Sequence, residues 1–278
     1  MSKDLIKVKQ LRDITGLGLT QCKTALEETS WDLGKAEDYL RVNGSYSKKL
    51  DSRNASDGSI FIWSGSVSSK TMIHLACETD FVAQNSSFCG SGLQIAKIVN
   101  SLGLESADQA NESDEIVALL DEVKSKVKEN VVLKEVVTLS GDQSSVFHYL
   151  HNNNSIGVLL EISGINTEDD ESVEMAQNIC LHIAASKPVS LCKESIPEDT
   201  LQREKGIHLA QLKGMEGKPE EIRNKIVNGK LAKFYKEVCL LEQPYVKDTS
   251  VSVGKYIENS NKFLGTGISV IRFSRYSK

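Results

Sequence analysis

The spacing of apolar residues changes from a helical to a strand period at about residue 58, and this change limits the possible folds more than any other feature. Before it, apolar residues recur every three or four positions, as at Leu5, Val8 and Leu11, which predicts amphipathic helices. Residues 46–58 are polar and have no apolar period, which predicts a linker. Apolar and β-branched runs follow, such as residues 72–77, and these predict strands. We therefore expect an α+β protein that begins with a helical domain.

Short helices are expected in residues 1–45. The first ends at Thr15-Gly16-Leu17-Gly18, because glycine suits the positive φ of a helix C-terminal turn. Thr20 and Asp32 are the expected N-caps of the second and third helices. Three helices in about 45 residues bury too little apolar surface to form a very stable unit. We therefore interpret residues 1–45 as a docking domain.

The remaining sequence consists of two similar blocks, residues 59–140 and residues 141–278. Each block contains strands and helices, and this similarity predicts a pseudo-repeated α+β core. A helical excursion is expected at about residues 195–228. Strands are expected at residues 60–62, 72–77, 131–139, 146–151, 156–162 and 268–273, and helices at residues 90–102, 105–122, 171–186, 201–213, 219–238 and 253–262.

The charge and hydropathy of the chain exclude several classes of protein. The 33 Lys and Arg residues are outnumbered by 38 Asp and Glu residues, and the formal net charge is −5. The chain is therefore not held on nucleic acid by a general excess of positive charge. No segment approaches the run of about 18 apolar residues that a membrane-spanning helix needs. The first residues lack the apolar core of a secretory signal, so a cytoplasmic protein is expected.

No catalytic arrangement stands out in the sequence. The phosphate-binding loop G-x-x-x-x-G-K-[ST], the G-x-S-x-G elbow and the H-E-x-x-H helix are all missing. Cys180 and His182 resemble a nucleophile and its base, but residues two apart on a helix point in different directions. We therefore expect a protein that is not an enzyme and has no cofactor or metal site. The cysteines form no C-x-x-C pair and are expected to be reduced, buried thiols: Cys22, Cys77, Cys89, Cys180, Cys192 and Cys239.

One short segment after a predicted buried strand differs from the rest. It reads Glu78-Thr79-Asp80-Phe81-Val82-Ala83-Gln84-Asn85. Thr79 suits the cap of a turn, and an acid and an aromatic residue follow at its tip. Phe81 is then either a core residue at a corner or a protruding side chain that enters a pocket of a partner.

Four parts of the chain, this segment among them, resemble the elongation factor Ts family, the guanine-nucleotide exchange factors of elongation factor Tu. They span almost the whole chain in the order of the family. The last part is the longest and most specific. The four parts are Thr15-Gly16-Leu17-Gly18 with Cys22-Lys23 and Ala25-Leu26; Glu78-Thr79-Asp80-Phe81-Val82-Ala83; His182-Ile183-Ala184-Ala185-Ser186 with Pro188; and Gly217-Lys218-Pro219, Lys225-Ile226-Val227 with Gly229-Lys230-Leu231, and Lys236-Glu237-Val238-Cys239-Leu240-Leu241-Glu242-Gln243-Pro244.

The resemblance implies a ubiquitin-associated-like fold for residues 1–45 and elongation factor Tu, a GTP-binding protein, as the partner. Arg12 and Lys23 match positions that dock on the GTP-binding domain of that partner. Asp80 and Phe81 match positions that approach the nucleotide site. Phe81 would then slip between side chains near the bound Mg²⁺, so that GDP leaves and GTP binds in its place.

Further contacts with the partner are implied at Val82, Val127, His151 and Val246. The resemblance implies no direct binding of nucleotide by this chain, no membrane contact and no specific nucleic acid. Relatives dimerise through the helical excursion, and the sequence leaves open whether this chain forms a homodimer.

The sequence departs from the family pattern at Lys128 and at Asn154-Ser155. Lys128 stands where a glycine is usual, directly after Val127. Asn154-Ser155 replaces the usual Gly-Arg or Gly-Lys before Ile156. A charged group therefore stands next to an implied contact, and the loop of the hairpin at residues 146–162 is altered.

Other functions were weighed against nucleotide exchange. An adaptor would use the N-terminal domain to bind a ubiquitin-like surface and would need nothing from Asp80 and Phe81. An enzyme built on Cys180 and His182 would require a reactive thiolate. Binding of RNA would use the basic C-terminal end, although a solvated face is the favoured interpretation; its charged residues are Lys262, Arg272, Arg275 and Lys278.

Overall fold

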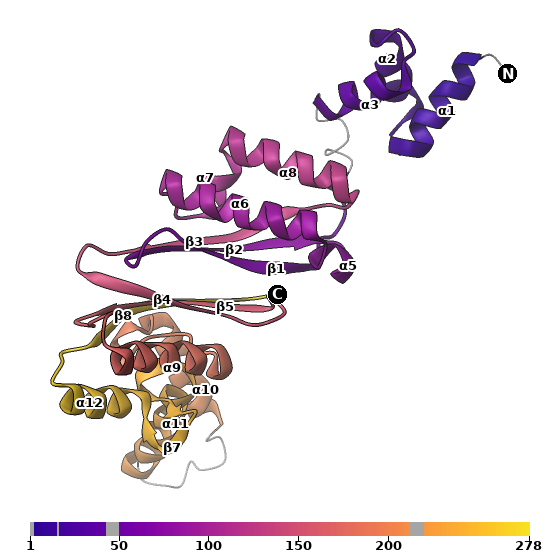
Figure 1. Ribbon diagram of the computed structural model, residues 1–278. Coiled ribbons are helices and arrows are strands. Elements are labelled where there is room, and N and C mark those ends of the chain that lie inside the picture. Colours follow the sequence, from indigo (N-terminus) through magenta and orange to yellow (C-terminus); the bar gives the residue numbers. More distant parts are fainter. Residues whose placement is uncertain (1–2, 16, 43–49, 212–219) are drawn as a thin grey trace. The chain divides into compact units, whose positions relative to one another are not determined.

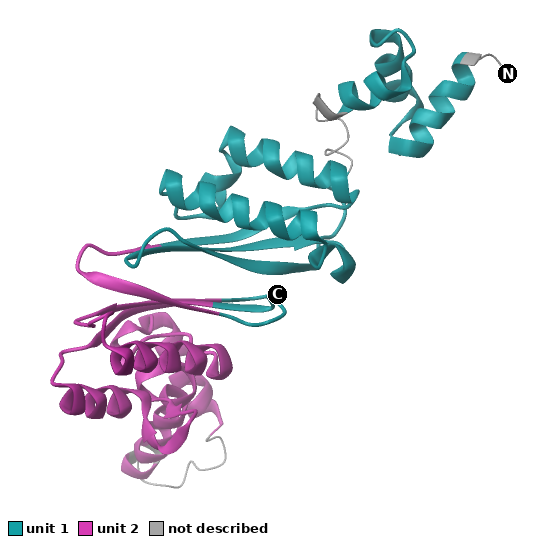
Figure 2. Cartoon of the chain, in the orientation of Figure 1, with its two compact units in different colours: residues 1–138, 150–157, 276–278 teal, residues 139–149, 158–275 magenta. Residues whose placement is uncertain are grey.

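The computed structural model describes residues 3–15, 17–42, 50–211 and 220–278. The chain divides into two compact units (Figure 2), one of residues 1–138, 150–157 and 276–278, the other of residues 139–149 and 158–275. After an N-terminal helical part, the chain forms runs of strands and runs of helices (Figure 1), so the predicted α+β class is confirmed. No helix among these residues is long and apolar enough to cross a lipid bilayer.

The N-terminal helices are α1 (Lys3–Thr15), α2 (Leu19–Glu28) and α3 (Leu33–Val42). Asp32 caps α3 as predicted, since its Oδ1 accepts a hydrogen bond from the Lys35 amide at 3.0 Å. The predicted cap Thr20 is wrong, because α2 begins at Leu19 and has Gly18, two residues before Thr20, as its N-cap. Gly16 and residues 43–49, the latter including the start of the expected linker, lie outside the described residues. The helices share a buried cluster of Val8, Leu11, Leu17, Cys22, Ala25, Leu26, Ala36 and Leu40.

The first sheet has the strand order β1-β2-β3. Its strands are β1 (Asp57–Ser64), β2 (Ser69–Cys77) and β3 (Val132–Ser140). β1 and β2 are antiparallel and pair from Asp57 opposite Cys77 to Ser64 opposite Lys70. The burial of β2 is continuous from Lys70 to Cys77, and β2 is the central strand of the sheet.

Helices cover one face of this sheet (Figure 1). They are α6 (Ser86–Leu102), α7 (Ala107–Asn111) and α8 (Asp114–Val127), and the single turn α5 (Asp80–Ala83) precedes them. The single helix predicted at residues 105–122 is wrong, because Ser113 is extended and serves as the N-cap of α8. Serine at this position favours a new helix start over continuation of the old helix.

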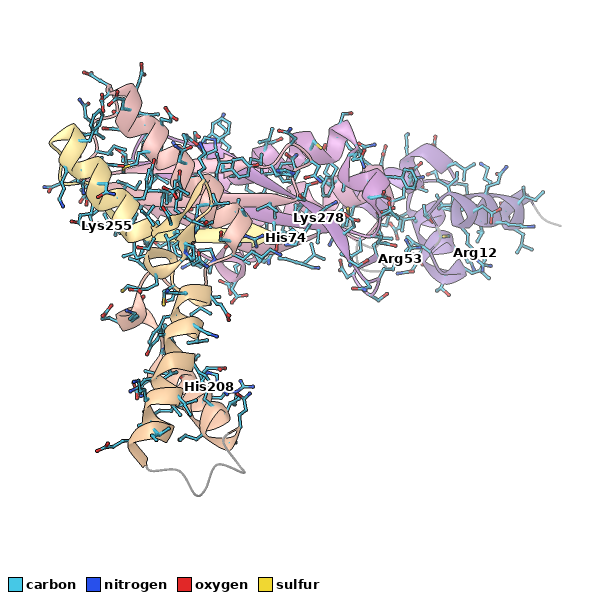
Figure 3. The ribbon with its side chains drawn as sticks, turned by 90° about the horizontal axis from the view of Figure 1, so that it is seen from below. Arg12, Arg53, His74, His208, Lys255 and Lys278 are labelled. Carbon is cyan, nitrogen blue, oxygen red and sulfur yellow. The ribbon has the colours of Figure 1, made fainter. Side chains whose placement is uncertain are left out.

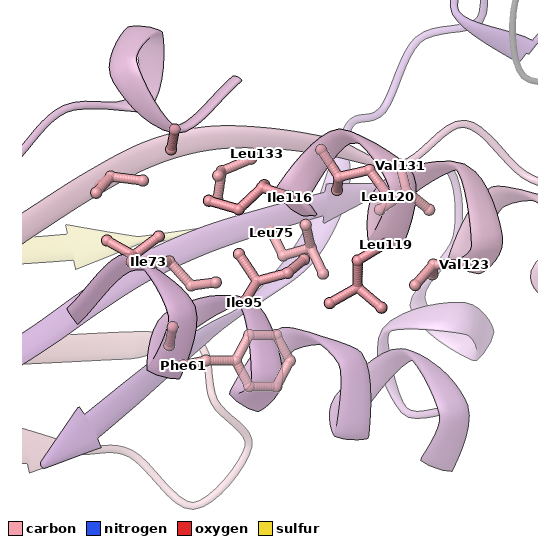
Figure 4. Packing of buried hydrophobic residues seen from close by; sticks show 14 of the residues in the cluster. Phe61, Ile73, Leu75, Ile95, Ile116, Leu119, Leu120, Val123, Val131 and Leu133 are labelled. Carbon is pink, nitrogen blue, oxygen red and sulfur yellow. The ribbon is translucent and has the colours of Figure 1, made fainter. Parts of the chain in front are cut away.

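The core of this layer is formed by apolar side chains of the helices and the sheet (Figure 4). The rings of Phe61 and Phe88 lie 6.0 Å apart at 58°, a tilted arrangement that aromatic pairs prefer. Gly92 lets α6 approach β1 closely, since a Cβ there would lie 2.3 Å from Phe61 Cε2. Substitution of Gly92 would therefore push the helix off the sheet.

The second sheet has the order β4-β5-β8, and its strands are β4 (Ser144–Leu150), β5 (Ile156–Ser163) and β8 (Ser269–Ser277). The other elements of the second unit are mostly helical. They are α9 (Asp170–Ser186), the 3₁₀ turn Lys193–Ser195, α10 (Glu198–Ala210), α11 (Glu220–Val238), the 3₁₀ turn Leu240–Glu242, β6 (Pro244–Tyr245), β7 (Asp248–Ser252) and α12 (Val253–Leu264).

The helical excursion is formed by α10 and α11, which pack against each other around Val227 and Leu231. Residues 212–219, which include part of the stretch that resembles the family, lie outside the described residues. Figure 3 shows His208 on this pair of helices. The short β6–β7 hairpin was not predicted from the sequence, because Pro244–Tyr245 is too short to show a strand period.

Candidate interaction site

The segment after β2 forms a single helical turn with an exposed aromatic residue. Thr79 is the N-cap of α5, and its Oγ1 accepts a hydrogen bond from the Val82 amide at 3.4 Å. Ala83 is buried at the other end of the turn, and its carbonyl accepts a hydrogen bond from Ser59 Oγ at 3.2 Å. Phe81 is 83% exposed. The side chain therefore protrudes from the turn and is not a core residue, while its entry into a pocket of a partner stays a prediction.

A carboxylate from the loop after α8 holds the entrance to this turn. Glu129 Oε2 accepts hydrogen bonds from the amides of Glu78 at 3.1 Å and Thr79 at 3.0 Å. Its Oε1 accepts a third hydrogen bond, from Thr79 Oγ1 at 2.7 Å. Hydrogen bonds to an ionised acceptor are roughly twice as strong as neutral ones. The backbone that leads to Phe81 is therefore fixed by a partner about 50 residues away in sequence.

A second carboxylate, that of Glu78, accepts a hydrogen bond from the loop after α8, whereas Glu129 of that loop accepts hydrogen bonds from residues 78–79. Glu78 Oε1 accepts a hydrogen bond from the Asn130 amide at 2.7 Å and pairs with Arg53 Nη1 at 3.2 Å. The Asn130 side chain donates from Nδ2 to the Arg53 carbonyl at 2.7 Å. Three segments therefore meet behind the turn: residues 51–53, 78–79 and 129–130.

The thiol next to this turn is not a nucleophile. Cys77 is buried and donates from Sγ to the Thr79 carbonyl at 3.2 Å. Burial, together with the nearby carboxylates of Glu129 and Asp57, raises the pKa of Cys77 to about 12. At neutral pH this thiol is protonated, and only the thiolate is a good nucleophile. The site therefore holds an exposed aromatic residue without a reactive group beside it.

The implied contact Val127 is the last residue of α8 and lies close to the base of the turn. Val82 and Val127 are both half-buried and pack against the same core cluster. Lys128 follows with φ 62° and ψ 25°, in the left-handed region. This conformation explains why a glycine is usual here, because a side chain makes it unfavourable by roughly 1–2 kcal/mol.

Replacing Lys128 with glycine should stabilise the protein. We expect a gain of about 0.5–1 kcal/mol, because relief of the left-handed conformation outweighs the greater flexibility of glycine in the unfolded chain. Thermal unfolding should then shift upward by roughly 2 °C. As a control, Lys126→Gly in the last turn of α8 should lower the midpoint. A lower midpoint for Lys128→Gly would contradict this account of the turn.

Arg12 and Lys23 both belong to the N-terminal helical domain, Arg12 in the last turn of α1 and Lys23 on α2. Both side chains are exposed, and Figure 3 shows Arg12 on its helix. Lys23 Nζ lies 3.6 Å from Glu27 Oε1. A groove of about 560 Å³ runs beside Lys23. Its lining residues are Asp4, Leu5, Val8, Leu19, Thr20, Lys23 and Trp31.

His151 lies exposed in the turn between β4 and β5. Its amide donates to the Ile156 carbonyl at 2.9 Å, and its carbonyl accepts from the Asn154 amide at 2.7 Å. Asn154 has φ 53°. Asparagine tolerates this left-handed conformation better than most residues, so the turn keeps its shape although the usual glycine is missing.

Val246 belongs to the second unit and is 45% exposed. Its amide donates to His182 Nδ1 at 3.2 Å, and the opposite ring nitrogen, Nε2, lies 2.9 Å from Gln243 Oε1. Because Nδ1 accepts, the proton of the neutral ring is on Nε2 and is donated to Gln243. His182 therefore holds the turn between β6 and β7 that presents Val246.

The same contacts exclude Cys180 and His182 as a nucleophile and its base. Cys180 is fully buried, and burial raises the pKa of its thiol. Both ring nitrogens of His182 already have partners. All six cysteines are free; four are buried as predicted, but the prediction is wrong for Cys89 and Cys192, which are only partly buried.

Buried histidines should make the protein less stable as the pH falls. Burial lowers the pKa of His182 and of His74, the latter despite Glu135 Oε2 at 3.1 Å from its Nδ1 (Figure 3). The unfolded chain therefore binds protons first, from about pH 6.5 downward. Each group contributes a slope of at most about 1.4 kcal/mol per pH unit. We expect the free energy of unfolding to be about 1–2 kcal/mol lower at pH 5.5 than at pH 7.5.

Urea unfolding at the two pH values measures this difference. His182→Gln should reduce the loss by about half, because it removes one of the two buried rings. A loss that persists in full in His182→Gln would contradict the role of this buried ring.

The structure thus brings some of the predicted site residues together and keeps others in separate places. Asp80, Phe81, Val82 and Val127 share the end of the first sheet and its helices. The sequence analysis missed the role of the residues that hold the site in place, which are Arg53, Glu78, Glu129, Asn130 and His182.

Comparisons with known proteins agree with the resemblance. A family model described as "Elongation factor TS" matches residues 78–278. An elongation factor Ts of Clostridium botulinum (strain Alaska E43 / Type E3) is 37% identical over 98% of this chain and 91% of its own length. The elongation factor Ts of Prosthecochloris aestuarii is 36% identical over 97% and 96%. That of Clostridium perfringens (strain SM101 / Type A) is 33% identical over 98% and 91%. The chain therefore belongs to the elongation factor Ts family of translation elongation factors.

Proposed function

We propose that the chain promotes release of GDP from elongation factor Tu by inserting Phe81 near the Mg²⁺ and phosphates of the bound nucleotide, after which GTP binds. One observation carries the proposal. Phe81 is 83% exposed at the tip of a turn whose backbone is held on both sides. Exposure of a large apolar side chain is unfavourable in the free protein, so its placement favours a partner that buries it.

The proposed activity needs no covalent chemistry from this chain. The partner's nucleotide site would be distorted by the inserted side chain, and the distorted form would bind GDP and Mg²⁺ more weakly. Asp80, exposed in the first turn of α5, would bring a negative charge close to the phosphates and weaken their binding further. The chain would then act as an exchange factor by binding alone.

Other surfaces would hold the chain on its partner. Burial of one phenylalanine is worth about 1.5–3 kcal/mol, which is too little to offset the loss of freedom on association. Arg12 and Lys23 on a ubiquitin-associated-like N-terminal domain would supply one docking surface. His151 and Val246 would supply contacts with the rest of the partner. These surfaces would provide the affinity for the partner. The binding energy would hold Phe81 in the nucleotide site, where it displaces GDP.

Release of a fluorescent GDP analogue from elongation factor Tu tests the proposal. The labelled complex is mixed with excess unlabelled GDP, with and without the chain, and the decrease in fluorescence is followed in time. We expect the rate to rise with the concentration of the chain and then to saturate. An unchanged rate, with a partner that still binds the chain, would overturn the proposal and favour an adaptor.

A further inference from the structure

The direction of the exposed Phe81 side chain depends on backbone contacts made elsewhere. Phe81 is the second residue of the four-residue helix α5, and at 83% exposure its own side chain has little to pack against. Its position must therefore come from the residues at the two ends of α5. The C-terminal end is fixed by burial of Ala83 and its hydrogen bond from Ser59.

The N-terminal end is fixed by Glu129, which does more than pair with a neighbour. Its Oε2 binds the amides of Glu78 and Thr79 at 3.1 and 3.0 Å. Its Oε1 accepts the Thr79 hydroxyl proton at 2.7 Å. The same hydroxyl oxygen then faces the Val82 amide, at 3.4 Å, as the cap of α5. Glu129 thus orients the cap as well as the chain that enters it.

Glu129 is itself held in place by its own loop. Lys128 before it turns the chain with a positive φ of 62°. Asn130 after it is buried and donates from its amide to Glu78 Oε1 at 2.7 Å. The carboxylate is half-buried, and three donors converge on it. This is a preorganised acceptor, because no donor has to move to meet it.

We infer that Glu129 is a positioning residue for nucleotide exchange, and that it acts by fixing the direction of Phe81. This inference rests on the proposed function. An exposed side chain that must enter a narrow site loses binding energy if it first has to be ordered. Glu129 removes that cost in the free chain. Its loss should therefore reduce the rate of GDP release more than the affinity for the partner.

The variant Glu129→Gln tests this inference, since it keeps the shape and replaces one acceptor oxygen with a donor group. We expect the rate of GDP release at saturating chain to fall about tenfold. The concentration that gives half of the maximal rate should change less than threefold. Glu122→Gln is the matched control, because Glu122 lies on the preceding helix and pairs with Lys126 at 2.5 Å. A release rate equal to that of the wild type would overturn the inference.

A double variant separates positioning from a general structural effect. If Glu129 acts through Phe81, then Glu129→Gln should have no further effect on the release rate when Phe81→Ala is already present. Multiplied effects of the two changes would overturn the inference. Thr79→Val removes one of the three donors and also the cap acceptor for the Val82 amide; it serves if Glu129→Gln does not fold, and it should slow release two- to threefold. An unchanged rate in Thr79→Val would also overturn the inference.

Hydrogen exchange of single amides in the free chain provides a readout that does not involve the partner. The amides of Glu78 and Thr79 should exchange at least tenfold faster in Glu129→Gln, while the Cys89 amide in α6, bonded to the Asn85 carbonyl at 2.9 Å, should not change. Unchanged exchange at Glu78 and Thr79 would overturn the inference. A wild-type chain that does not accelerate GDP release would instead overturn the proposed function.

Discussion

Replacing Phe81 with alanine should slow GDP release from the complex with elongation factor Tu by about 10- to 150-fold. This range corresponds to the 1.5–3 kcal/mol that burial of such a side chain supplies. Affinity for the nucleotide-free partner should fall much less, by about fivefold or below. The reason is that the docking surfaces remain, whereas the contact that distorts the nucleotide site is lost.

Stopped-flow release of a fluorescent GDP analogue measures the first effect, and titration calorimetry with nucleotide-free partner measures the second. The chain offers a matched control in Phe263 on α12, which is 79% exposed and is not an implied contact. Phe263→Ala should leave the release rate unchanged. Phe81→Leu keeps most of the apolar volume of the side chain. Its GDP release rate should therefore fall less than that of Phe81→Ala. Equal losses of release rate and affinity in Phe81→Ala would show that Phe81 contributes only to binding of the partner and not to distortion of the nucleotide site.

The sequence was sufficient where a residue's role depends on its close neighbours. The change of apolar period at residue 58 predicted β1 and β2 after the N-terminal helices, because periodicity reports which face of an element is buried. The same reasoning placed a cap at Thr79, and the cap is confirmed. For Phe81 two alternatives stayed open, because composition favours core packing for a corner aromatic but does not exclude protrusion.

The residues that hold the site could not be predicted, because their partners are distant in sequence. Glu129 binds residues about 50 positions earlier, and His182 binds an amide 64 positions later. A local pattern contains no trace of such pairs. The left-handed conformation of Lys128 was not predicted either, because a lysine does not indicate a positive φ as a glycine does.

Saturating GDP should weaken binding of the chain to elongation factor Tu by at least about 100-fold. The chain should in turn weaken GDP binding by the same factor, because the coupling free energy between two ligands of one protein is reciprocal. The factor must be large, since moving a two-state equilibrium even from about 1:10 to about 10:1 requires a preference of about 100-fold for one state. Reciprocity also explains how the exchange factor dissociates. The next nucleotide to bind elongation factor Tu lowers the affinity of elongation factor Tu for the chain.

Two titrations measure the coupling. The chain is titrated into partner with and without saturating GDP, and GDP is titrated into partner with and without saturating chain. In Phe81→Ala both ratios should shrink together, because Phe81 is the group through which the two ligands oppose each other. Ratios near one for the wild type would contradict the mechanism, even if the chain bound tightly. Tight binding alone shifts no equilibrium, since only a difference in affinity for the two states of the partner can displace its nucleotide.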